Sequence, residues 1–180
     1  MGAIVLTGFM GTGKSEVGRR LATRLGRAFV DTDQLVERDA GKSVAAIFAD
    51  DGEAAFRARE RDAVAAASAR RDAVIAVGGG AILDATNVAR LRQAGVVVCL
   101  TASAETVLRR VGTTAHRPLL AGDDPRAAIE RLLAERRPAY DAAADVTVDT
   151  TDRRPEDVVE EICERVGRFE RERQQWKSST

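Results

Sequence analysis

Residues Gly8–Ser15 restrict the fold of this chain more than any other segment. They read Gly-Phe-Met-Gly-Thr-Gly-Lys-Ser and match every fixed position of the phosphate-binding pattern G-x-x-x-x-G-K-S/T. The apolar run Ala3–Thr7 precedes this segment, and the helix-like stretch Lys14–Leu25 follows it. A strand, a glycine-rich turn and a helix in that order gather backbone N–H groups and the positive end of a helix around one anion. The segment therefore predicts an α/β fold that binds a nucleoside triphosphate.

Each part of this loop has an expected task. Glycine lets the backbone turn tightly, Lys14 can reach the β- and γ-phosphates, and Ser15 can ligate Mg²⁺. Asp31 ends the predicted strand Ala28–Asp31, where its carboxylate would face the loop and could hold Mg²⁺ through water; a helix N-cap is the alternative. The residues that we expect to bind the phosphates of ATP are Gly11, Thr12, Gly13, Lys14 and Ser15.

Strands alternate with helices along the whole chain. This alternation predicts a parallel sheet with helices on both faces and ligands at the carboxyl ends of the strands. The polar and glycine clusters 8–15, 31–33 and 78–80 all follow predicted strands, which places them on one rim. The predicted strands are Ala3–Thr7, Ala28–Asp31, Ala73–Val77, Val96–Leu100 and Val146–Asp149. The predicted helices are Lys14–Leu25, Gln34–Ala40, Val44–Phe48, Glu53–Arg70, Asp84–Gln93, Ser103–Val111, Pro125–Arg137 and a last one from Pro155 to about Arg168.

Composition excludes several classes of partner. The 180 residues suit one domain, and 28 basic residues balance 28 acidic ones, so no net field favours nucleic acid or a membrane surface. No apolar run approaches the ~18 residues of a membrane span, and no signal peptide is visible. Cys99 and Cys163 lack metal-ligand spacing and are expected to be reduced packing residues. We expect a cytoplasmic protein and, because no long apolar face is unassigned, a monomer.

Among proteins with this loop, a small kinase fits best. A GTPase would carry an Asn-Lys-x-Asp guanine reader, but the only asparagine is Asn87, and Val88 follows it. A motor or transport ATPase would place an acidic pair after a buried strand. Ala73–Val77 leads into glycines and Val96–Leu100 into Thr-Ala, so neither strand supplies that pair.

A longer set of motifs resembles the shikimate kinase family over about residues 3 to 166. Three of them belong to the acceptor half of that family and not to phosphate-binding loops in general: Asp-Thr-Asp at 31–33, Gly-Gly-Gly at 78–80 and Arg-x-Pro-x-Tyr at 136–140. The other matching segments are Gly8–Ser15, Gly41-Lys42-Ser43, Ile47-Phe48, Phe56-Arg57 with Glu60, and Arg117-Pro118-Leu119-Leu120. The resemblance implies a three-layer α/β/α kinase fold with a five-stranded parallel sheet, a lid and a small helical substrate-binding segment.

The resemblance also implies roles in the acceptor site. Arg57 and Arg136 would clamp the carboxylate of shikimate, since a guanidinium pairs bidentately with a carboxylate. Asp33 would accept hydrogen bonds from substrate hydroxyls and is the candidate base. Gly79 would offer a backbone N–H where a side chain would block close approach. Glu60 lies one helical turn from Arg57 and would orient it.

On the nucleotide side, the resemblance assigns Arg117 to the transferring phosphate. This residue lies in the long loop 112–124, which we expect to act as a lid. Lys14, Mg²⁺ and Arg117 would surround the charge of the transition state, so that Lys14, Asp33 and Arg117 form the catalytic set. Arg110 and Arg154 resemble the adenine-side contacts of the family.

The sequence thus predicts transfer of the γ-phosphoryl group of ATP to the 3-hydroxyl of shikimate, with Mg²⁺ held by Ser15 and Asp31. The alternatives are a small kinase for another sugar acid, such as gluconate, and a non-catalytic nucleotide-binding regulator. We expect a single kinase domain over residues 1–168, with its substrate-binding segment at about 32–60, and a polar tail over 169–180.

Overall fold

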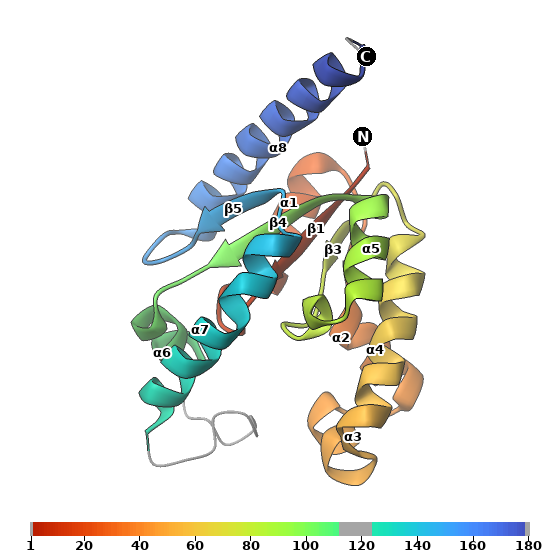
Figure 1. Ribbon diagram of the computed structural model, residues 1–180, viewed down its shortest axis with the longest axis vertical. Coiled ribbons are helices and arrows are strands. Elements are labelled where there is room, and N and C mark those ends of the chain that lie inside the picture. Colours follow the sequence, from red (N-terminus) through yellow and green to blue (C-terminus); the bar gives the residue numbers. More distant parts are fainter. Residues whose placement is uncertain (1, 112–123, 179–180) are drawn as a thin grey trace.

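A computed structural model describes residues 2–111 and 124–178. Its centre is a parallel sheet of five strands in the order β2-β3-β1-β4-β5 (Figure 1). The strands are β1 (Ala3–Gly8), β2 (Phe29–Asp31), β3 (Val74–Ala76), β4 (Gly95–Thr101) and β5 (Val146–Asp149). The helices are α1 (Lys14–Leu25), α2 (Thr32–Ala40), α3 (Val44–Asp50), α4 (Gly52–Ser68), the 3₁₀ turn η1 (Ala81–Leu83), α5 (Ala85–Ala94), α6 (Ala104–Val111), α7 (Pro125–Ala143) and α8 (Pro155–Ser178).

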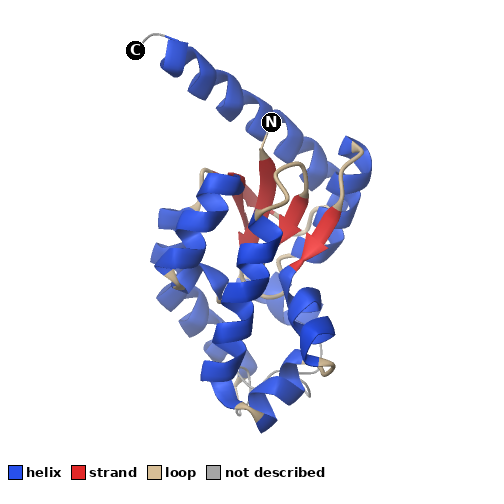
Figure 2. Cartoon of the chain, turned by 90° about the vertical axis from the view of Figure 1, so that its right-hand side faces the viewer, coloured by secondary structure: helices blue, strands red, loops and turns tan. Residues whose placement is uncertain are grey.

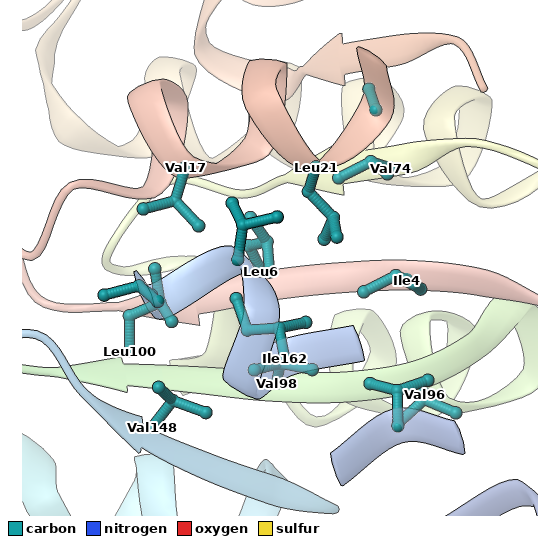
Figure 3. Packing of buried hydrophobic residues seen from close by; sticks show 14 residues of the cluster. Ile4, Leu6, Val17, Leu21, Val74, Val96, Val98, Leu100, Val148 and Ile162 are labelled. Atoms are coloured by element: carbon teal, nitrogen blue, oxygen red, sulfur yellow. The ribbon is translucent and has the colours of Figure 1, made fainter. Parts of the chain in front are cut away.

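Helices cover both faces of the sheet (Figure 2), and the central strand β1 is buried along its whole length. Ile4 and Leu6 pack with residues of α1 and α8, such as Leu21 and Ile162 (Figure 3). Ala3 and Val5, which point to the other face, pack with α4 and α5. An apolar run of this kind is typical of a strand in the middle of a parallel sheet covered by helices. The predicted α/β class with a five-stranded parallel sheet is confirmed.

The register of the sheet brings the predicted polar clusters to one rim. Leu6 pairs with Ala76 of β3, and Ala76 pairs with Asp31 of β2. The loop that begins at Gly8, the carboxylate of Asp31 and the glycines that follow β3 are therefore neighbours. In Figure 1, α3 and α6 lie at the end of the molecule toward which the strands point, and α8 extends past the opposite end.

Helices α7 and α8 extend several residues past their predicted ends. Helix α7 continues through Pro138 to Ala143, although proline removes one helix hydrogen bond. The buried side chains Tyr140 and Ala143 pack in the cluster around Phe9 and Cys99, and this packing outweighs the proline penalty. Helix α8 continues past Arg168 to Ser178 as one helix, so the beginning of the predicted polar tail is helical.

The remaining differences are local. The turn η1 was not predicted, and α2 begins at Thr32, two residues before its predicted start, because Asp31 caps it. Of the predicted lid, Asp124 is the N-cap of α7, where its side chain accepts a hydrogen bond from the Ala127 N–H; residues 112–123 lie outside the described residues. Within the described ranges, no helix has the length and apolar character needed to cross a membrane.

Candidate active site

The loop between β1 and α1 is shaped as an anion cradle. Gly8 has a φ of +138°, and a Cβ atom there would lie 2.2 Å from the Leu100 carbonyl oxygen, so a larger residue does not fit. The buried Thr12 hydroxyl donates a 2.8 Å hydrogen bond to the Phe9 carbonyl. Gly13 precedes α1, and no side chain in the described part of the chain caps this helix. A helix N-terminus without a side-chain cap is suited to bind an anion.

Lys14 and Ser15 contact different parts of this cradle. The Lys14 ammonium donates to the carbonyl oxygens of Gly8 at 2.8 Å and Phe9 at 3.0 Å. The Ser15 hydroxyl donates to Asp31 Oδ2 at 2.8 Å, and Asp31 Oδ1 accepts from the Asp33 N–H at 3.1 Å. Asp31 is therefore the N-cap of α2 and also faces the loop, so capping leaves its carboxylate beside Ser15.

The donor pair of Ser15 and Asp31 fits a magnesium ion. A hydroxyl and a carboxylate are hard oxygen ligands, and Mg²⁺ in phosphate-transfer sites uses one or two protein oxygens together with phosphates and water. Among residues 2–111 and 124–178, no group of three or more His, Cys, Asp or Glu side chains could hold a metal ion. Two protein ligands, Ser15 and Asp31, match a magnesium ion whose other ligands come from a nucleotide and water.

A cleft of about 350 Å³ joins the loop to the predicted acceptor side. It brings together residues from four separate parts of the chain, namely the loop, the start of α2, the triple glycine and α6. The predicted site residues that line it are Gly11, Gly13, Lys14, Ser15, Asp31, Asp33, Gly79 and Arg110.

Asp33 is the carboxylate with the most perturbed environment in this cleft. Burial, together with the negative charge of Asp31, raises the pKa of Asp33 to about 6, although the Lys14 ammonium opposes the shift. Its Oδ1 atom is buried and finds no hydrogen-bond partner in residues 2–111 or 124–178. A Cβ atom on Gly78 would lie 2.6 Å from this oxygen, so glycine is required there for the carboxylate to fit. An unpaired, partly protonatable oxygen of this kind is suited to accept a hydroxyl proton.

Arg57 lies beside the triple glycine and is held by two glutamates. Its Nη1 donates a 2.7 Å hydrogen bond to Glu60 Oε2, and Glu53 accepts a second hydrogen bond from its Nη2 at 3.2 Å. Glu60 is only 2% exposed, and burial raises its pKa while Arg57 opposes the shift. A Cβ atom on Gly80 would come within 2.5 Å of Arg57 Nη1. The predicted Glu60–Arg57 contact is thus present, and it points the guanidinium at the glycines.

Arg136 of α7 lies beside the phosphate-binding loop. Its guanidinium carbon lies 5.8 Å from the centre of the Phe9 ring, within range of a cation–π contact with the loop. The next residue, Arg137, is exposed and pairs with Asp141 at 3.6 Å. The Tyr140 hydroxyl donates a 2.6 Å hydrogen bond to the Gly79 carbonyl. Sequence reasoning used Tyr140 only as a motif residue, although its spacing of four from Arg136 placed both on one helix face.

On the nucleotide side, Arg110 reaches the loop but Arg154 does not. Arg110 Nη1 donates to the Gly11 carbonyl at 3.3 Å and to the Thr150 hydroxyl at 2.9 Å, and its Nη2 donates to the Thr150 carbonyl at 2.6 Å. The Thr150 hydroxyl also lies 3.1 Å from the Thr12 carbonyl oxygen. Thr150, which sequence reasoning missed, carries no motif signal. The Arg154 side chain is 78% exposed and pairs with Asp157 at 2.7 Å. Arg117 lies outside the described residues.

Comparison with known proteins identifies the family. The family model described as shikimate kinase matches residues 10–167. The chain belongs to the shikimate kinase family. The shikimate kinase of Symbiobacterium thermophilum is 53% identical over 165 residues, which cover 91% of this chain and 95% of that protein. The shikimate kinase of Caldanaerobacter subterraneus subsp. tengcongensis is 50% identical over 159 residues, with 88% and 92% covered.

A solved shikimate kinase structure shares the fold. The enzyme from Acinetobacter baumannii in complex with shikimate superposes with a TM-score of 0.87 at 39% identity, covering 91% of each chain. The motifs that carried the resemblance thus belong to a shikimate kinase family match that spans most of this chain.

Proposed function

We propose that this chain transfers the γ-phosphoryl group of ATP to the 3-hydroxyl of shikimate, giving shikimate 3-phosphate and ADP, in the route to chorismate and the aromatic amino acids. One observation carries the proposal beyond the family match. The carboxylate of Asp33 and the backbone of Gly79 line one cleft with the triphosphate-binding loop, Arg57 lies against the adjoining Gly80, and Arg136 lies over Phe9 of the loop; these are the groups that a hydroxylated carboxylic acid needs. The names of the relatives support shikimate over gluconate as the acceptor.

The acceptor is held by groups of different chemistry. Arg57 of α4 lies against Gly80 and Arg136 of α7 lies over Phe9 of the loop, and both would bind the carboxylate of the acceptor through paired N–H donors. The backbone N–H of Gly79 and the free oxygen of Asp33 would bind its hydroxyls. Fixing a carboxylate and hydroxyls together orients one hydroxyl toward the phosphate-binding loop, and such orientation supplies much of the rate in phosphoryl transfer.

Asp33 would then take the proton of the attacking hydroxyl. With a pKa of about 6, it is mostly ionised at neutral pH and still basic enough to accept a proton. Lys14 would exchange its carbonyl partners for the β- and γ-phosphates, and Arg117 would meet the transferring phosphoryl group. A magnesium ion held by Ser15 and Asp31 would neutralise charge on the phosphate oxygens. We further propose that the enzyme is a cytoplasmic monomer that needs no nucleic acid or membrane.

The test is ADP release by the purified protein with Mg-ATP and shikimate, gluconate or no acceptor. We expect turnover that depends on shikimate. Arg136→Ala should lower kcat/KM for shikimate by about 100-fold or more, because a charged hydrogen-bonding partner of the carboxylate is lost. Arg137→Ala is the matched control: this neighbour is exposed and pairs only with Asp141 among the described side chains, so its loss should change kcat/KM less than twofold.

Each other outcome has a definite meaning. Turnover with gluconate would leave the nucleotide half intact and refute the acceptor assignments at 33, 57, 79 and 136. Nucleotide binding without turnover on either acceptor would favour the regulatory alternative.

A further inference from the structure

Tyr140 of α7 lies beside the triple glycine, close to the phosphate-binding loop. Its hydroxyl donates a 2.6 Å hydrogen bond to the Gly79 carbonyl oxygen, and the residue is only 5% exposed. A Cβ atom on Gly79 would lie 3.5 Å from this hydroxyl and 3.4 Å from the Gly8 carbonyl oxygen of the phosphate-binding loop. The hydroxyl therefore contacts the glycine whose backbone N–H is proposed to meet the acceptor.

The same hydrogen bond sets the direction of a neighbouring N–H group. The Gly79 carbonyl and the Gly80 N–H belong to one trans peptide unit, so they point in opposite directions. Gly80 also lies against the Arg57 guanidinium. By holding the Gly79 carbonyl toward α7, Tyr140 turns the Gly80 N–H away from α7 and polarises it as a donor.

Tyr140 also holds the helix that carries Arg136. The two residues are four apart on α7 and lie on one face of the helix. Pro138 stands between them and has no N–H to donate to the Ala134 carbonyl, so the helix lacks one hydrogen bond at this point. A helix weakened there can bend, and a contact beyond the proline restrains it. The hydrogen bond from Tyr140 to Gly79 is such a contact.

We propose that Tyr140 is a positioning residue for the acceptor, whose hydroxyl sets the distance between the Arg136 guanidinium and Gly79, so that the guanidinium and the Gly79 N–H meet one shikimate molecule. The inference rests on the proposed function, and in particular on the roles of Arg136 and Gly79. Burial raises the pKa of Tyr140 to about 12, so the phenol keeps its proton and remains a donor at neutral pH.

The test is Tyr140→Phe, which removes the hydroxyl and keeps the ring. A buried carbonyl left without its donor is unfavourable and free to turn, so shikimate affinity, measured calorimetrically without nucleotide, should fall about tenfold. The KM for shikimate should rise by the same factor, while the KM for ATP stays within twofold. A role limited to stability would not separate the two KM values. An unchanged shikimate affinity would overturn the inference.

Asn87→Leu is the matched control. Asn87 is fully buried, and its Nδ2 donates a 3.1 Å hydrogen bond to the Ala81 carbonyl, two residues beyond Gly79. This variant loses a comparable buried hydrogen bond beside the same glycines without touching Gly79. We expect thermal unfolding to shift as in Tyr140→Phe and both KM values to stay within twofold. An equal rise in the KM for shikimate would mean general loosening and overturn the inference.

Arg136→Ala separates the two possible failures. If this variant binds shikimate as tightly as the unsubstituted protein, the proposed carboxylate clamp is wrong. If Arg136→Ala loses affinity and Tyr140→Phe does not, the clamp stands and only the positioning role of Tyr140 is wrong.

Discussion

Asp31 and Asp33 are two carboxylates of one short segment with opposite surroundings. Asp31 accepts hydrogen bonds at both oxygens, from Ser15 and from the Asp33 N–H. Asp33 is buried beside that charge, and its Oδ1 has no partner in the described residues. Environments that differ in this way assign different tasks to identical side chains. These surroundings make Asp31 suited to bind a metal ion and Asp33 suited to accept a proton.

This difference predicts the acid limb of the pH profile. Protonation of Asp33 removes the acceptor for the substrate hydroxyl, so kcat/KM for shikimate should fall about tenfold for each pH unit below the pKa. The fall should begin near the pKa of about 6. Initial rates at saturating Mg-ATP between pH 4.5 and 8 would measure it. The control variant Arg137→Ala should show the same decrease of kcat/KM at acid pH. A profile that stays flat to pH 4.5 would contradict the role of Asp33 as the proton acceptor.

The same pKa shift predicts that stability falls as the pH rises, whereas activity increases. Because the pKa of Asp33 in the folded chain is higher than its ordinary value of 3.8, the folded chain binds the proton more tightly. The free energy of unfolding therefore falls as pH rises from about 4 to 6, by roughly 2 kcal/mol from this group. Asp33→Asn lacks the ionisation, so it should exceed the unsubstituted protein in stability at pH 8 by up to about that amount, with the gap closing at pH 4.

Urea unfolding of Asp33→Asn at pH 4 and pH 8 tests this sign, and kcat should fall about 100-fold or more in the same variant. Asp62→Asn, at an exposed position of α4, is the control and should change neither quantity. A variant equally destabilised at both pH values would show that the Asp33 carboxylate is not strained by burial.

Among the elements, the end of β5 joins the nucleotide half of the site. Thr150 follows β5, is 2% exposed, and contacts the loop at Thr12, the end of β4 at Thr101 and helix α6 through Arg110. One hydroxyl thus couples three elements that are far apart in the sequence. We expect Thr150 to position groups for the nucleotide as Tyr140 is proposed to do for the acceptor.

Thr150→Val keeps the shape of the side chain and removes its hydroxyl. We expect the KM for ATP to rise about tenfold, since Arg110 and the loop lose a shared buried partner, while the KM for shikimate stays within twofold. Thr150→Ser restores the hydroxyl and should restore the KM for ATP. Steady-state kinetics with each substrate varied in turn would decide, and a rise confined to the KM for shikimate would contradict the coupling.

For the molecule overall, α8 has a packed part and a projecting part. Ile162 and Val166 lie in the core cluster, and Phe169 packs against it, whereas residues 170 to 176 are mostly exposed. Figure 1 shows the last turns extending past the end of the sheet that is far from the site. The catalytic unit is therefore expected to end near Phe169.

Two truncations test this boundary. A chain that ends at Gln174 should unfold within about 1 °C of the full protein, because mainly exposed side chains are removed. A chain that ends at Arg168 also loses Phe169, and removal of a large side chain packed against the core should lower stability by about 1–3 kcal/mol. Both should keep kcat/KM within twofold. Loss of activity in the longer one would place a functional role in the tail.

Much of the fold could be predicted because its signals are local. Helix α1 has the predicted bounds, since glycines on both sides of Lys14–Leu25 adopt left-handed conformations that end the helix. The apolar runs predicted the ends of β1, β2, β3 and β4 to within two residues. Both predicted ends of β5 agree with the structure. The phosphate-binding loop was recognised whole, because its chemistry depends on consecutive backbone groups. The acceptor residues came from motifs that resemble the family, not from periodicity.

The sequence alone determined the phosphate-binding loop, the order of strands and helices, and the kinds of residue at the carboxyl ends of the strands. Only the tertiary structure decided that Arg136 faces the loop while Arg137 faces outward, that α7 passes through Pro138, and that burial shifts the pKa of Asp33 to about 6. It alone revealed that Tyr140 and Thr150 join distant segments. The reason is physical: a turn or a helix end depends on neighbours in the chain, whereas burial, charge environment and side-chain partners depend on residues brought together by folding.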